Sequence, residues 1–337
     1  MFEAATAETS AEPTTADTAK KLPIKIVTHF YPDPDALASI WAAIRFLAQT
    51  QGRECHPIFV KAGEALPAED YEGFEVITVD TGRGALDQHG KNIGEMSSFR
   101  LFCAQYGLLE DPGLRPIIEL TILSDNVRHS KIPATSIHFV LKGLPYYFRD
   151  PKSKEVDWSA VVNEACKLFD IIYDQACMQA KAVKDFQTFG RVVTLKNGLK
   201  LGTIWHRPHL RQAAFDAGCD VVMWTQDLKG DRKGLFYPAI QAHEETDPHL
   251  KFDSVIAGIR FAEAAKRGSD TKGINMRIWG QHKNLFGGWF MHDSCRFIAC
   301  GTRAHELEKH ECTLLSEREI LNIIVARLEK EPFLRKR

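Results

Sequence analysis

Acidic and histidine residues follow the ends of strand-like segments in the first 130 residues of this chain. His29 ends the apolar run 24–29, and Asp80 ends the run 74–80. The remaining members of this set are Asp33-Pro34-Asp35, Asp87-Gln88-His89 and Asp125. Metal-assisted hydrolysis of phosphate esters requires carboxylates and imidazoles around two cations roughly 3.5–4 Å apart. The sequence therefore predicts a two-metal site in this region.

The same region alternates short β-rich runs with segments of helical apolar spacing, which predicts an α/β fold. Because strands that alternate with helices form parallel sheets, we expect a mostly parallel sheet covered by helices. In such sheets ligands bind beyond the carboxyl ends of the strands, where His29 and Asp80 lie. The predicted strands are 24–29, 56–61 and 74–80, and the predicted helices are 35–50, 97–108 and 114–126.

Beyond about residue 130 the pattern predicts one long helix over 158–186, followed by an α+β arrangement of strands and helices. The first 22 residues are poor in large apolar groups, which is typical of a disordered tail. We therefore divide the chain into a tail (1–22), a metal-binding domain (23–150), a connecting helix (151–188) and a C-terminal α+β domain (189–337).

Composition limits the classes of protein to which the chain can belong. Its 337 residues favour two domains. Lys and Arg number 43 against 44 Asp and Glu, so a nucleic-acid contact requires a local basic patch. We find no apolar stretch that could span a membrane and no secretory or transit signal, and eight scattered cysteines suit a reducing compartment. We therefore expect a soluble, cytoplasmic protein.

Several of these features have simpler explanations. Asp33-Pro34-Asp35 is typical of a turn in which Asp35 caps the next helix. The Asp80 and Asp87 segments also fit ordinary surface loops. A zinc site remains an alternative for the cysteines and histidines between 295 and 312, although Cys295 and Cys300 lie five residues apart on a predicted strand and would point to opposite faces.

Taken together and in this order, the acidic and histidine residues resemble the motifs of the DHH phosphoesterase superfamily. The first motif, H-x-x-x-D-x-D, matches residues 29–35. An Asp at a strand end matches Asp80, the D-H-H triplet matches Asp87-Gln88-His89, and a fourth Asp matches Asp125. The resemblance covers about residues 24–130 and implies a DHH-type N-terminal domain.

This resemblance implies a role for each residue in binding two Mn²⁺ or Mg²⁺ ions. His29 and Asp33 would bind the first ion, Asp35 and Asp125 the second, and Asp80 would bridge them. Asp80 and His89 are the candidate catalytic residues. The triplet departs from the family at Gln88, where a histidine is expected. Because an amide oxygen is a weaker ligand than imidazole for Mn²⁺, either Gln88 binds the second ion loosely or His89 replaces it.

A second resemblance, at residues 290–306, is to the melanocyte-proliferating-gene exonuclease branch of the superfamily. In that branch a histidine precedes a glycine-rich strand and a basic residue. By this likeness His292, Arg296 and Arg303 would bind substrate phosphate, because arginine forms bidentate hydrogen bonds with phosphate. The alternative is a buried strand followed by solvent-exposed arginines.

The resemblance implies a metal-dependent phosphodiesterase or exonuclease, a hydrolase acting on short oligonucleotides or a related nucleotide. The alternative is a catalytically weak nucleotide- or metal-binding regulatory module that keeps the fold. Other candidate contacts to a nucleic-acid substrate are the basic segment 205–212 and four tryptophans, which equally suit core packing. These tryptophans are Trp205, Trp224, Trp279 and Trp289.

Overall fold

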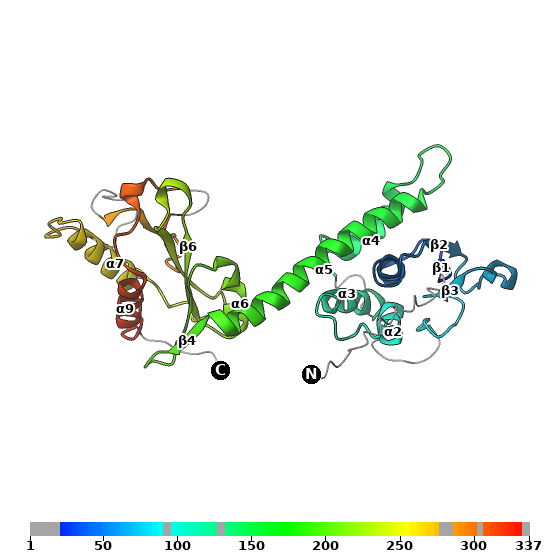
Figure 1. The fold of residues 1–337 in the computed structure, drawn as a ribbon, viewed down its shortest axis with the longest axis horizontal. Coiled ribbons are helices and arrows are strands. Elements are labelled where there is room, and N and C mark those ends of the chain that lie inside the picture. The colour runs from blue at the N-terminus through cyan, green and yellow to red at the C-terminus, as the bar shows by residue number, and fades with distance from the viewer. Residues whose placement is uncertain (1–20, 90–95, 127–131, 276–285, 302–305, 332–337) are drawn as a thin grey trace, which may run out of the picture. The chain divides into compact units, whose positions relative to one another are not determined.

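A computed structural model of the chain describes residues 21–89, 96–126, 132–275, 286–301 and 306–331. The chain divides into two compact units, Met1–Ala176 and Cys177–Arg337. The boundary falls inside a single long helix, α5 (Trp158–Phe189), drawn in green in Figure 1. Each unit contains its own cluster of buried apolar side chains.

The first unit is built on a three-stranded parallel sheet in the order β2-β1-β3. Its strands are β1 (Ile24–His29), β2 (Cys55–Val60) and β3 (Glu75–Thr78). The central strand has the sequence IKIVTH and buries Ile24 and Ile26 through Thr28, as expected for a parallel strand covered on both faces. Ile24 pairs with both Cys55 and Glu75, so the three strands end near one edge.

Helices cover this sheet and supply most of the first core. Trp41, Phe99, Phe102 and Phe169 are fully buried there, because apolar residues recur at helical spacing on the inner faces of their helices. The helix after β1 is α1 (Pro34–Ala42), which continues as a π-helical segment (Ala43–Ala48) and a 3-10 turn (Gln49–Gln51). The others are α2 (Ser98–Gln105), α3 (Arg115–Asn126), α4 (Ile137–Tyr147) and a 3-10 turn at Ala68–Tyr71.

The second unit contains a six-stranded mixed sheet in the order β4-β5-β6-β7-β9-β8. Among these described strands only β5 and β6 pair in parallel; the other neighbours are antiparallel. Met223 packs on one face, and Val222 and Trp224 pack on the other, because successive side chains of a strand alternate. The strands are β4 (Arg191–Thr194), β5 (Lys200–Ile204), β6 (Val221–Asp227), β7 (Phe236–Ala242), β8 (Trp289–Met291) and β9 (Phe297–Cys300).

Helices lie on both faces of this second sheet (Figure 1). Helices α7 (Asp253–Lys266) and α9 (Glu317–Leu328) pack on one face, and α6 (Arg211–Asp216) with the end of α5 packs on the other. Ser316 and Glu319 form a capping box at the start of α9. Single 3-10 turns occur at Pro208–Leu210, Gly230–Arg232 and Lys309–Glu311.

The predicted α/β class is therefore confirmed, with a parallel sheet in the first unit and a mixed α+β arrangement in the second. None of the helices in the described residues is both long enough and apolar enough to cross a membrane.

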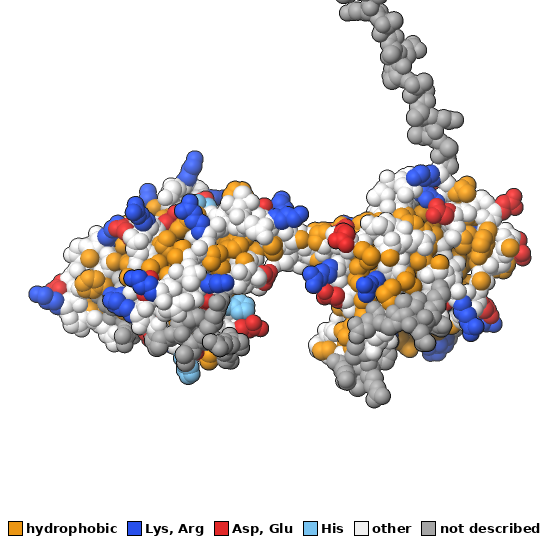
Figure 2. Space-filling view, turned by 90° about the horizontal axis from the view of Figure 1, so that it is seen from below, with side chains coloured by type: hydrophobic (Ala, Val, Ile, Leu, Met, Phe, Trp, Pro, Cys, Tyr) orange, Lys and Arg blue, Asp and Glu red, His pale blue; other side chains and the backbone are white. Residues whose placement is uncertain are grey.

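The near-neutral total charge is divided unevenly between the two units. Residues 1–176 contain 17 Lys and Arg against 25 Asp and Glu, and residues 177–337 contain 26 against 19. Lys and Arg side chains are prominent on the second unit in the face that Figure 2 shows.

Candidate metal centre

His29 and Asp80 meet at the carboxyl edge of the parallel sheet. His29 ends β1, and Asp80 follows the neighbouring parallel strand β3 by two residues. The Nε2 atom of His29 lies 3.0 Å from Oδ2 of Asp80, and its Nδ1 atom lies 2.8 Å from the carbonyl oxygen of Phe30. Asp80 is only 3% exposed. Its backbone φ of 52° is in the left-handed region, which few residues other than Gly, Asn and Asp adopt readily.

Asp33, not Asp35, caps the helix that follows β1. Oδ1 of Asp33 accepts hydrogen bonds from the backbone N–H groups of Asp35 and Ala36, at 2.9 and 3.1 Å. Pro34 occupies the first helical position, where its missing N–H costs nothing. The suggestion that Asp35 is the cap was therefore wrong by two residues, because the helix starts at Pro34 rather than after Asp35.

Asp35 instead joins α1 to the start of α2. It is fully buried, and its two carboxylate oxygens accept hydrogen bonds from the backbone N–H groups of Ser98 and Phe99, at 2.7 and 2.8 Å. These N–H groups belong to the first turn of a helix, which attracts negative charge. This contact was not predicted from the sequence. The two serines that precede the apolar residues of 97–108 were the only local sign of a helix start.

Asp87 holds the loop that carries the triplet. Its Oδ2 atom accepts from the N–H of Arg83 at 2.8 Å, and its Oδ1 atom accepts from the N–H of His89 at 2.9 Å. The Nε2 atom of His89 then lies 3.2 Å from Oδ1 of Asp80. The side chain of His89 is 71% exposed, whereas that of Asp80 is 2% exposed. His89 is therefore accessible to solvent while it contacts the buried carboxylate.

The Gln88 side chain directs its amide nitrogen toward two carboxylates. Nε2 donates to Oδ1 of Asp80 at 3.2 Å and lies 3.4 Å from Oδ2 of Asp125, near the end of α3. Its amide oxygen accepts a hydrogen bond from the hydroxyl of Ser98. The oxygen that was predicted to bind a metal therefore faces Ser98 in this structure.

Two groups of side chains among the described residues bring possible ligand atoms within 4.8 Å of one another. The first group is His29, Asp33 and Asp80, and the second is Asp80, Asp87 and His89. Asp80 belongs to both groups. Asp35 and Asp125 lie beside them, because the charges of Asp33 and Asp80 act on both of these carboxyl groups. All seven predicted metal ligands are therefore clustered in the first unit.

The electrostatics of this cluster favour the uptake of positive charge. Burial, together with the charges of Asp33 and Asp80, raises the pKa of Asp125 to about 8. Burial also raises the pKa of Asp35 well above its usual range, with the charge of Asp125 as the next cause. The hydrogen bond to Asp80 raises the pKa of His29 to about 9. Protons or cations must therefore neutralise this cluster at neutral pH.

We predict that the metal-free protein becomes less stable as the pH rises from 6 to 9. Carboxyl groups with raised pKa values stabilise the fold while protonated, and this contribution is lost as the pH rises through about 8 for Asp125. The contribution of His29 is lost in the same direction, through about 9. With a chelator present, the melting temperature is expected to fall by about 5 °C. An Asp125→Asn variant should show a smaller fall in melting temperature over the same pH range. A melting temperature that rises with pH in the wild type would contradict this account.

In the second unit, His292 and Arg296 lie in the turn between β8 and β9. The exposed His292 ring contacts the hydroxyl of Ser294, with Nδ1 and Oγ 3.1 Å apart. The guanidinium of Arg296 donates to backbone carbonyls in the segment 243–247, at 2.8 Å to Asp247 and 2.5 Å to His243. Arg296 therefore supports a neighbouring loop. Arg303 lies outside the described residues.

This geometry predicts that Arg296→Ala destabilises the second unit. The substitution leaves the carbonyls of residues 243, 246 and 247 without their charged donor, which we expect to cost about 1.5–3 kcal/mol of unfolding free energy. Urea denaturation measures the effect, with Arg191→Ala on the exposed edge strand β4 as the control. Unchanged stability would leave Arg296 free for the substrate role that the resemblance implies.

The other sequence candidates in the second unit are mainly structural. Trp224 and Trp289 are 9% and 2% exposed, so the packing interpretation is confirmed for both. Trp205 is partly buried against the second core. Trp279 lies outside the described residues. In the basic segment 205–212, Arg207 stacks on Phe189 with 3.8 Å between its guanidinium carbon and the ring centroid.

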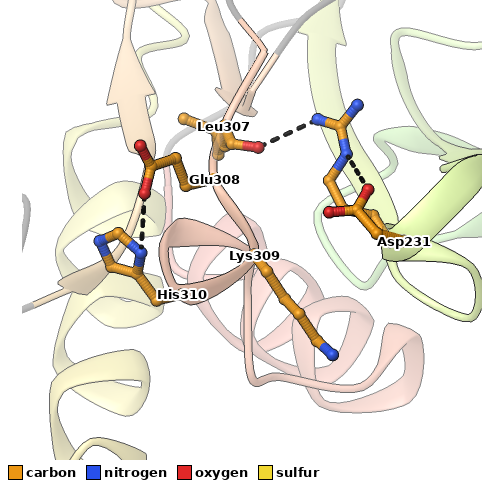
Figure 3. A pocket seen from close by; sticks show the side chains of 6 residues that line it. Asp231, Leu307, Glu308, Lys309 and His310 are labelled. Atoms are coloured by element: carbon orange, nitrogen blue, oxygen red, sulfur yellow. Dashed lines mark hydrogen bonds and ion pairs between the residues drawn. The ribbon is translucent and has the colours of Figure 1, made fainter.

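Within the described residues of the second unit, neither the cysteines nor the cavity beside Arg232 forms a comparable site. Cys295 lies in the β8–β9 turn, whereas Cys300 and Cys312 are buried, and no group of possible metal ligands in the described residues includes them. A cavity of about 670 Å³ is lined by Asp231, Arg232 and residues 307–310 (Figure 3). Charged side chains that line it pair with one another. For example, Nδ1 of His310 lies 3.3 Å from Oε2 of Glu308. The cavity contains none of the predicted site residues.

Comparison with known proteins gives few matches. No protein-family model matches the sequence, and no curated protein does. The pGpG-specific phosphodiesterase PggH from Vibrio cholerae is 12% identical, with 91% of this chain and 99% of that chain covered at a TM-score of 0.32. A DHH-domain protein described as a member of a family of ribosomal proteins is 11% identical, with 92% and 87% covered at a TM-score of 0.30.

Proposed function

We propose that this chain is a metal-dependent phosphoesterase of the DHH superfamily. The observation that carries the proposal is that side chains from the β1–α1 turn and from the loop after β3 converge on Asp80. His29 and Asp33 come from the β1–α1 turn, Asp80 follows β3, and His89 comes from the loop beyond it. Carboxylates and imidazoles that share one buried aspartate form the type of ligand set that two-metal phosphate hydrolysis requires.

The residues present fit divalent cations of the hard or borderline class. Aspartate oxygens with one or two imidazoles suit Mn²⁺ or Mg²⁺, and no cysteine lies in either group of ligands. One ion would bind at His29, Asp33 and Asp80. The second would bind between Asp80, Asp35 and Asp125, as the family resemblance implies. When bound, such ions supply Lewis acidity to the phosphoryl oxygens and to a water molecule.

The protein's own residues would position the reactants around these ions. Asp80 would link both ion positions, and its burial excludes competing water from the shared carboxylate. His89, exposed and in contact with Asp80, would exchange a proton at Nε2 with substrate or solvent. The excess of Lys and Arg in residues 177–337 supports a role for the second unit in binding phosphate. His292, Arg296 and Arg303 are the proposed contacts there.

We propose a phosphodiester in a short oligonucleotide or a related nucleotide as the substrate. A catalytically weak module that binds a nucleotide or a metal is the second candidate, favoured by Gln88 in place of the histidine of the family's triplet. The two differ in one property. The phosphodiesterase releases a mononucleotide in the presence of Mn²⁺, whereas the regulatory module binds the nucleotide or the metal without turnover.

A substrate panel tests the proposal. The purified chain is incubated with Mn²⁺ and a linear dinucleotide such as pGpG, a cyclic dinucleotide, longer RNA, longer DNA or pyrophosphate. We expect hydrolysis of the short linear substrate, with loss of activity in a chelator and recovery on addition of Mn²⁺. Binding of the dinucleotide without product would favour the regulatory module. Hydrolysis of pyrophosphate alone would contradict the proposed substrate.

A further inference from the structure

Ser98 and Gln88 form a hydrogen-bonded pair beside the proposed metal centre. The fully buried Ser98 is the first residue of α2, and its backbone N–H is fixed by the bond to Oδ2 of Asp35. Its hydroxyl donates to the amide oxygen of Gln88. The amide nitrogen of Gln88 consequently faces Asp80 and Asp125, at 3.2 and 3.4 Å from their nearest oxygens.

The chemistry of the neighbours explains this amide orientation. The amide nitrogen of Gln88 faces the carboxyl groups of Asp80 and Asp125 and, at 3.4 Å, Nε2 of His89, all of which can accept a hydrogen bond. On the other side, the serine hydroxyl can donate to the amide oxygen. A reversed amide would place its oxygen against Oδ1 of Asp80, another acceptor, and would turn its N–H₂ group toward the hydroxyl of Ser98. Because an amide N–H₂ group cannot bind a cation, the Gln88 side chain must turn before its oxygen could do so.

We propose that Ser98 is a positioning residue that makes binding of the second metal ion conditional. Held by Ser98, the Gln88 amide joins Asp80 to Asp125 through hydrogen bonds, in the place where a second cation would otherwise join them. The second ion binds only when these bonds break, so its affinity is about tenfold lower than that of the first. Occupancy of the second position then follows the concentration of the divalent ion. This inference rests on the proposed function, because it concerns the same metal centre.

Calorimetric titration of the full chain with Mn²⁺ tests this role. For the wild type we expect one tightly bound ion and a second bound about tenfold more weakly. Ser98→Ala removes the hydroxyl but keeps the backbone N–H that binds Asp35. Because the Gln88 amide can then turn freely, the second dissociation constant in this variant should approach the first to within about threefold. The first dissociation constant should stay unchanged.

Ser39→Ala is the matched control. Ser39 is also a fully buried serine in contact with Asp35, but its hydroxyl donates to the backbone carbonyl of Asp35, 3.0 Å away, and not to a side chain of the metal centre. We expect it to keep the wild-type difference between the two dissociation constants. Gln88→Ala removes the amide itself and should bring the two dissociation constants closer together, as Ser98→Ala does. It provides a second test if Ser98→Ala does not fold.

The outcomes separate this inference from the proposed function. Two ions of equal affinity in the wild type, or an unchanged difference in both Ser98→Ala and Gln88→Ala, would overturn the role of Ser98. If Mn²⁺-dependent hydrolysis persists in those cases, the proposed function stands. A wild-type chain that binds no Mn²⁺ and hydrolyses no phosphodiester would overturn both.

Discussion

An Asp80→Asn variant is expected to lose at least about a thousandfold in Mn²⁺-dependent turnover. Asp80 is the one carboxylate shared by both groups of ligand atoms, and it contacts His29 and His89 on opposite oxygens. An amide of the same shape removes the negative charge that both ions would share. Steady-state hydrolysis of the best substrate of the panel measures the loss, and calorimetry measures the accompanying loss of bound Mn²⁺.

Asparagine is the appropriate replacement because Asp80 has a left-handed backbone. At a φ of 52°, asparagine is tolerated, whereas alanine would cost about 1–2 kcal/mol of stability and confuse folding with catalysis. The control is Asp70→Asn, an exposed aspartate of the same unit, which should retain full activity. Near wild-type turnover of a folded Asp80→Asn variant would show that Asp80 does not bridge metal ions.

Asp35→Ala is expected to lower the unfolding free energy by about 2–4 kcal/mol. The substitution leaves the N–H groups of Ser98 and Phe99 buried without their acceptor, and it breaks the link between α1 and α2. Urea denaturation in a chelator at pH 6 measures this effect. At that pH the raised pKa of Asp125 keeps its carboxyl group protonated, so the substitution relieves little repulsion between these two residues.

Asp125→Ala provides the comparison within the same cluster. Asp125 lies in α3 and contacts side chains of the cluster, so we expect its replacement to change stability by less than about 1 kcal/mol at pH 6. Equal losses in the two variants would contradict this expectation. In that case the hydrogen bonds to the start of α2 would have no special structural role.

Local sequence was sufficient to predict the elements that carry the site. The run IKIVTH is apolar enough to be a buried parallel strand, and β1 occupies the same residues, 24–29. Because parallel strands align their carboxyl ends, the proximity of His29 and Asp80 also followed from the pattern. The long helix from residue 158 was an equally local signal, and it is confirmed.

The features that the sequence analysis missed depend on contacts between distant segments. Asp35 and Ser98 are 63 residues apart, and nothing in either segment indicates that one carboxylate binds the start of another helix. The orientation of Gln88 depends on the same helix start, so a ligand role could be assigned only by resemblance. Helix α4 was also missed, because Gly143 and Pro145 within it are typical of helix ends.

The most direct test of the central claim is to locate bound Mn²⁺ by anomalous X-ray diffraction from crystals grown with MnCl₂. The account predicts a strong peak in contact with His29, Asp33 and Asp80, and a second, weaker peak beside Asp80 and Asp125. Crystals of the Asp80→Asn variant should lack both peaks. Mn²⁺ bound elsewhere, with no peak at Asp80 in the wild type, would contradict the assignment of this cluster as a metal centre.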